Sequence, residues 1–108
     1  MLRTLVALAV CLAPAPAFAQ AEDGRVAAGC MSIYTTQSGL AEGDARADAQ
    51  DRLRRSLRRL RLAAPDPQDG RALVGEEAAA LRTRITAASD RQALFAELLA
   101  ACDNWLDG

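Results

Sequence analysis

The chain has 108 residues, three cysteines, no histidine and no lysine, and its net charge at neutral pH is −1. Without histidine it lacks the usual general base near neutral pH and the commonest metal and haem ligand. It also contains no P-loop and no GxGxxG motif. We therefore expect a protein that has no catalytic site, binds no metal and needs no cofactor.

Residues 1–19 have the pattern of a secretory signal peptide. Arg3 supplies the positive charge, an apolar run from Leu5 to Ala13 follows, and Ala17-Phe18-Ala19 is a typical cleavage site. The apolar run is too short to span a bilayer comfortably, which disfavours the alternative of an uncleaved anchor. We predict cleavage after this site, a single domain over residues 20–108 and a periplasmic location.

Cleavage would remove Cys11 and leave an even pair of cysteines, Cys30 and Cys102, in an oxidising compartment. We predict that these two form one disulfide, with two buried free thiols as the alternative. A domain of this size buries only a modest core, so a covalent staple would add substantially to its stability.

The first predicted helix runs from Asp23 to Gln37 and places Cys30 on its inward face. Ile33–Thr36 is rich in β-branched and aromatic residues, which favour a strand locally. Helix is preferred because the rest of the chain offers no partner strand. Gly39 is expected to end this helix in the left-handed conformation. Tyr34 is expected at the edge of the inward face, where it could line a surface groove.

The second predicted helix begins at Asp44, as its N-cap, and ends near Ala63 before a Pro-Asp-Pro sequence. Its apolar stripe consists of Ala49, Leu53, Leu57, Leu60 and Ala64. Asp66 is expected to cap the third helix, with Pro67 in its first position, and this helix continues to about Ala88. A start near Ala72 is the alternative, because Gly70 and Gly75 weaken the first half of the helix.

The clearest amphipathic pattern covers Ser89–Leu106, which predicts a fourth helix with Ser89 and Gln92 as a capping box. It carries most of the large apolar side chains, including Trp105, so the other helices are expected to cover it. Four helices with short loops predict an all-α, up-down-up-down four-helix bundle in which Cys30 and Cys102 lie side by side. An irregular array of three or four helices is the alternative.

The second helix is strongly basic, with seven arginines against two aspartates between Arg46 and Leu62, while the rest of the domain is acidic. The guanidinium fork of arginine binds carboxylates bidentately, which favours an acidic protein partner. The candidate partner-binding residues are Arg54, Arg55, Arg58, Arg59 and Arg61.

Two other interpretations of the basic helix remain open. The arginines can pair with the chain's own acids, since Asp48 and Asp51 each lie four residues before an arginine. An anionic membrane surface is disfavoured because the apolar face holds only leucine and alanine. Nucleic acid is disfavoured because the protein is expected to be exported and no aromatic residue interrupts the arginines.

The sequence thus predicts an exported, non-enzymatic helical protein that binds an acidic protein partner. The alternative function is a periplasmic holdase chaperone, since the size, the single disulfide and the helical content resemble small periplasmic acid-stress chaperones as a class. A carrier of a small ligand is a third possibility, which close packing of alanine-rich helices disfavours.

Overall fold

The computed structural model describes the backbone of residues 14–108 and the side chains of residues 21–108. This part of the chain forms helices joined by short connections and contains no strand. The helices are α2 (Pro14–Leu40), α3 (Gly43–Ala63), α4 (Pro67–Ala87) and α5 (Arg91–Asp107). The predicted all-α class is therefore confirmed, and Ile33–Thr36 is helical. Most of the predicted signal peptide, residues 1–13, lies outside the described residues.

The first predicted helix is longer than expected, and its predicted end is wrong. Ala41 donates its backbone N–H to the carbonyl of Gln37 at 2.9 Å, so helical hydrogen bonding continues past Gly39 to the end of α2. The left-handed backbone position is instead Gly43, with a φ of 58°, at the start of α3. The glycine thus reverses the chain as it enters the second helix.

Two of the three predicted N-caps are also corrected. Glu42, not Asp44, occupies the cap position of α3, and its side chain makes no capping hydrogen bond. Asp90, not Ser89, caps α5 by accepting a hydrogen bond from the N–H of Ala93 at 3.0 Å. A carboxylate also interacts favourably with the positive end of the helix dipole, which explains the shift by one residue. The cap at Asp66 is confirmed, since it accepts from Gln68 at 2.8 Å.

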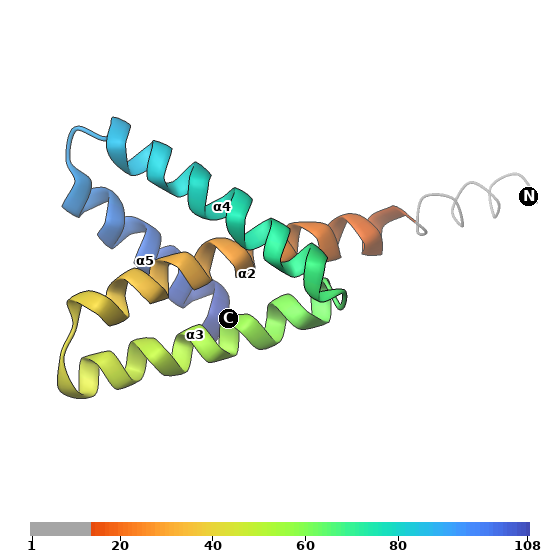
Figure 1. Ribbon diagram of the computed structural model, residues 1–108, viewed down its shortest axis with the longest axis horizontal. Coiled ribbons are helices and arrows are strands. Elements are labelled where there is room, and N and C mark those ends of the chain that lie inside the picture. The colour runs from red at the N-terminus through yellow and green to blue at the C-terminus, as the bar shows by residue number, and fades with distance from the viewer. Residues whose placement is uncertain (1–13) are drawn as a thin grey trace, which may run out of the picture.

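The helices are arranged around α2 (Figure 1). α3 runs back along α2 for most of its length, α4 crosses α2, and α5 returns so that its C-terminal end lies beside α2 and α3. α4 makes fewer contacts with α3 and α5 than with α2. The described helices therefore form a small all-α bundle, as predicted, in which α2 makes most of the contacts between helices.

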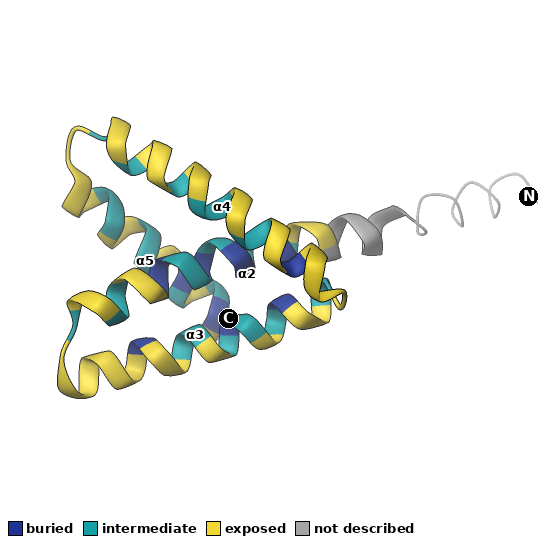
Figure 2. Ribbon diagram, in the orientation of Figure 1, coloured by how far each residue is buried: buried dark blue, intermediate teal, exposed yellow. Residues whose placement is uncertain are grey.

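The buried residues lie mostly on α2 (Figure 2). This differs from the expectation that the other helices cover α5, because α5 contributes only Cys102 and Leu106 to the fully buried set. α2 takes the central position because its small residues allow close approach. A Cβ at buried Gly24 would already touch Ala63 and Leu73, at 3.4 and 3.5 Å. The core consists of two groups of buried residues, one around Cys30 and Tyr34 and the other around Ala28 and Leu60. Trp105 packs against both groups and joins them.

The predicted disulfide between Cys30 and Cys102 is confirmed. The two Cα atoms are 5.6 Å apart, and both residues are buried among Ile33, Tyr34 and Leu106. The bond fastens the end of α5 to the middle of α2. No helix in residues 14–108 is both long and apolar enough to cross a membrane.

Candidate functional site

The arginine-rich helix α3 is rotated relative to its predicted apolar stripe. Its buried residues are Ala49, Ser56 and Leu60, whereas the predicted Leu53 and Leu57 are only half-buried. Ser56 is fully buried and donates its hydroxyl to the carbonyl of Arg52 at 2.9 Å, so this polar group is satisfied within the helix. The rotation turns one side of the arginine surface toward α5.

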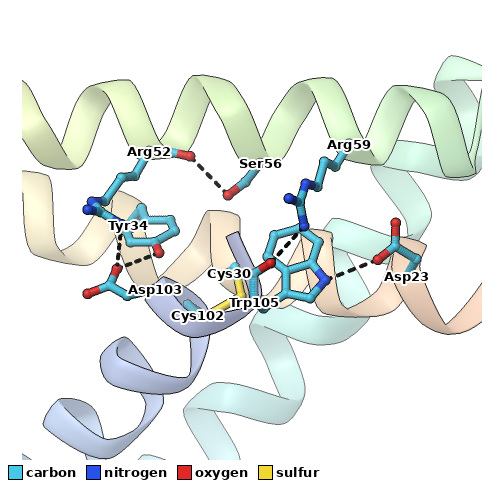
Figure 3. Close-up of a disulfide and its surroundings, with 9 residues drawn as sticks. All are labelled: Asp23, Cys30, Tyr34, Arg52, Ser56, Arg59, Cys102, Asp103 and Trp105. Carbon is cyan, nitrogen blue, oxygen red and sulfur yellow. Dashed lines mark hydrogen bonds and ion pairs between the residues drawn. A yellow bond between two sulfur atoms is a disulfide. The ribbon is translucent and has the colours of Figure 1, made fainter. Parts of the chain in front are cut away.

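We call Arg52, Arg55 and Arg59 the inner row, because their positions at i, i+3 and i+7 share this inward-turned side. Arg52 bridges three carboxylates, Asp48 at 3.1 Å, Asp103 at 3.2 Å and Asp107 at 3.1 Å. Its side chain is only 22% exposed. The cluster joins the middle of α3 to the C-terminal end of α5 (Figure 3).

Tyr34 adds a third helix to this cluster, and it lies deeper than the edge of the inward face, where the sequence placed it. It is fully buried, and its hydroxyl donates to Oδ1 of Asp103 at 2.6 Å, the same oxygen that Arg52 contacts (Figure 3). Burial, and then the hydrogen bond to Asp103, raise the pKa of the Tyr34 hydroxyl above its ordinary value of 10. The hydroxyl is therefore a neutral donor throughout the physiological pH range.

Arg59 caps the C-terminus of α5. Its guanidinium donates to the backbone carbonyls of Trp105 at 2.8 Å and Leu106 at 2.9 Å, which lie in the last turn and lack helical partners. The last turn of α5 contains no basic residue of its own, so α3 supplies the positive charge that suits this end of the helix dipole. The guanidinium also stacks 4.5 Å from the centroid of the Trp105 ring (Figure 3).

Trp105 completes the fastening of α5. Its indole N–H donates to Asp23 on α2 at 3.0 Å, so the buried polar end of the ring is satisfied (Figure 3). The predicted packing role of Trp105 agrees with its contacts to both halves of the core. The C-terminal turn of α5 is thus held by the disulfide, by Arg52 and Arg59 from α3, and by Asp23.

Arg54, Arg58 and Arg61 form a second line on α3, which we call the outer row. They lie at i, i+4 and i+7, so their side chains share one face, and all three are exposed. None forms an ion pair with another residue in the part of the chain that the structure describes. Leu62, 80% exposed, lies beside this row.

The five arginines proposed from the sequence are therefore not equivalent in the structure. Arg55 pairs with Asp107 at 3.2 Å and Arg59 caps α5, so these two are engaged within the protein. The outer row holds the other three. The chain's own acids therefore pair with one side of α3, as one interpretation of the sequence held. The other side keeps exposed arginines, which the interpretation as a partner-binding surface requires.

The sequence did not single out the acceptors Asp103, Asp107 and Asp23. Their partners could not be identified from the sequence, because these hydrogen bonds join residues more than fifty positions apart, as from Arg52 to Asp107. The local signal was the four-residue spacing of Asp48 before Arg52 and of Asp51 before Arg55, and both pairs form, at 3.1 and 4.0 Å. The described residues hold no cluster of three or more side chains suited to a metal ion.

The inner row makes stability depend on acid pH. The hydrogen bond from Arg52 holds the pKa of the Asp107 carboxyl below its ordinary value of 3.8. A depressed pKa contributes stability that is complete above the ordinary value and is lost as pH falls through the lower folded value. We predict that Asp107→Asn reduces the loss of stability below about pH 4, measured by urea unfolding across pH. An unchanged pH profile in the variant would contradict this role.

The fold and this surface define a small all-α protein with one disulfide and a divided arginine helix. Comparisons with known protein families, with characterised protein sequences and with solved structures found no match to the chain. The functional inference therefore rests on the chemistry of the described residues alone.

Proposed function

We propose that this chain is an exported, non-enzymatic protein-binding module whose outer row, Arg54, Arg58 and Arg61, docks an acidic surface of a partner protein. The single observation that supports it most strongly is the selective pairing of α3. The inner row is saturated by the protein's own carboxylates and carbonyls, whereas the outer row has no such partners among the described residues.

The physical basis of the proposal is the geometry of guanidinium groups on one helical face. Three exposed arginines within two helical turns offer parallel N–H forks to carboxylates on a partner. Their mutual repulsion is relieved when an acidic surface binds. The exposed Leu62 beside them supplies apolar contact area. The signal-like sequence of residues 1–19 and the disulfide support a periplasmic setting for this encounter.

The experiment is chemical cross-linking in the native periplasm followed by mass spectrometry of the co-purified proteins. We expect one dominant partner whose recovery falls about tenfold or more in the Arg54→Glu, Arg58→Glu double variant, because attraction to acidic groups becomes repulsion. Recovery should also fall as salt is raised, since exposed charge pairs are screened.

The matched control is Arg82→Glu with Arg91→Glu. Both residues are exposed, on α4 and α5, and form no ion pair within the described chain, so this variant has the same change in net charge elsewhere on the surface. Recovery of the partner should remain at the wild-type level. Equal recovery with both double variants would refute the proposed docking face.

A second function, a holdase chaperone, is favoured by one observation. The C-terminal end of α5 is fastened in part by Asp107, which pairs with Arg52 and Arg55 and whose carboxyl loses its charge as pH falls through its lowered pKa, so acid would weaken the contact of α5 with α3. Such loosening exposes apolar surface. This function predicts suppression of client aggregation below about pH 4 and a broad set of cross-linked clients. Absence of suppression at both acid and neutral pH would eliminate it.

A further inference from the structure

An apolar groove of about 600 Å³ opens between α2, the end of α3 and the start of α4. Its apolar lining includes Met31 from α2, Leu57 and Leu60 from α3, and Val74 from α4. Gly70 of α4 is buried here, with its missing Cβ position 3.8 Å from Leu60, so the absence of a side chain leaves this part of the groove open.

The charged residues that line this groove are both arginines, whereas Asp66 and Asp69 are close in sequence but are not part of the lining. Arg61 and Arg71 both line it and are exposed, and no acidic residue of the described chain appears in its lining. The other large apolar groove, lined by α2, α4 and α5, contains Glu77 together with Arg25 and Arg84, so it carries a charge of each sign. Only the first groove combines apolar surface with an unbalanced pair of guanidinium groups.

The groove also continues the proposed docking face. Arg61 is the last member of the outer row and lines the groove at the same time. A partner segment that lies along Arg54 and Arg58 would therefore reach the groove at the C-terminal end of α3. A helical segment presents apolar side chains at i, i+3, i+4 and i+7 and can carry acidic residues beside them.

We propose that this groove, lined by Met31, Leu57, Leu60 and Val74 and flanked by Arg61 and Arg71, receives the apolar side chains of an acidic amphipathic helical segment from the partner protein. This rests on the proposed function, and it specifies the partner's chemistry: leucine-like side chains enter the groove while adjacent carboxylates pair with the two guanidinium groups. Apolar anchors in a groove with charged groups at its edge give both affinity and orientation.

The test measures binding of a fluorescent helical peptide with leucines at i, i+3, i+4 and i+7 and glutamates flanking them, by fluorescence anisotropy on the full chain. We expect Arg71→Glu to weaken binding about tenfold, since a charge-assisted pair becomes a repulsive one. Arg82→Glu, an equally exposed arginine on the same helix but outside the groove, should leave the affinity unchanged. Peptides with serine for leucine, or lysine for glutamate, should bind at least tenfold more weakly.

The inference is overturned if the leucine–glutamate peptide does not bind, or if Arg71→Glu and Arg82→Glu have equal effects. Binding of decanoate, a small amphiphile with one carboxylate, without binding of the peptide would overturn it as well, because the groove would then be a small-ligand site. If Arg54→Glu with Arg58→Glu weakens the peptide and Arg71→Glu does not, the groove assignment fails and the outer row stands. The reverse pattern would retain the groove and reject the outer row.

Discussion

Replacing both Cys30 and Cys102 with alanine is expected to lower the free energy of unfolding by about 4 kcal/mol. The bond closes a ring across a sequence separation of 72 residues, and the entropy that such a ring removes from the unfolded chain grows with its length. This loss is large for a domain whose size permits only a small core. Urea unfolding followed by circular dichroism gives the value, and refolding of the variant from denaturant tests reversibility.

Reduction of the wild-type protein provides the control for this prediction. Dithiothreitol opens the same ring without changing either residue, so the reduced protein and the double variant should unfold at similar urea concentrations. A loss below about 1 kcal/mol in both cases would contradict the stabilising role of the bond. A loss in the variant alone would assign the effect to the packing of the two buried side chains.

Tyr34→Ala is expected to cost about 4 kcal/mol, because it removes a fully buried ring at the centre of α2. The ring packs with Ile33, Cys102 and Leu106, so its loss leaves a cavity where α2 meets α5. Tyr34→Phe keeps the ring and removes only the hydrogen bond to Asp103, so it should cost about 1 kcal/mol. Urea unfolding of the two variants separates packing from hydrogen bonding.

The two tyrosine variants also test the buried position of the ring. An exposed tyrosine would tolerate alanine with little change in stability. Equal and small losses for Tyr34→Ala and Tyr34→Phe would therefore contradict the buried position. If Tyr34→Phe lowers the free energy of unfolding by more than about 2 kcal/mol, the hydroxyl contributes more than an ordinary hydrogen bond.

The helices and the disulfide were predictable because their causes are local or nearly so. The 3.6-residue apolar pattern and the Pro-Asp-Pro sequence at Pro65–Pro67 place α3 and α4 within a residue or two of their observed ends. With only Cys30 and Cys102 left in the domain, the pairing had a single solution. The fold class follows from these features without any knowledge of packing angles.

The central position of α2 was not predictable from apolar content. Its buried residues include Ala27 and Ala28, which add little to an apolar pattern but allow neighbouring helices to approach closely. α5 holds most of the large apolar side chains, yet Leu94 and Phe95 are only half-buried, because the start of α5 lies away from α3. Shape, rather than hydrophobicity, decides which helix is surrounded.

The division of the arginines of α3 into an inner and an outer row could be predicted only in part from the sequence. Spacing alone shows that Arg54 and Arg58 share a face and that Arg52 and Arg59 share another. Which face meets α5 depends on the burial of Ser56, a polar residue that the apolar pattern places outside. The candidate set therefore contained both free and engaged arginines, and only the packed structure separates them.

The two rows are distinguished by the free energies of unfolding of two charge-reversal variants, Arg54→Glu with Arg58→Glu and Arg52→Glu with Arg59→Glu. We predict that reversal in the outer row changes stability by less than about 0.5 kcal/mol, because these side chains make no ion pairs within the described chain. Reversal in the inner row should cost at least about 2 kcal/mol, since it removes hydrogen bonds to Asp103 and to the end of α5. Equal losses in the two variants would contradict the division of α3 into a structural row and a docking row.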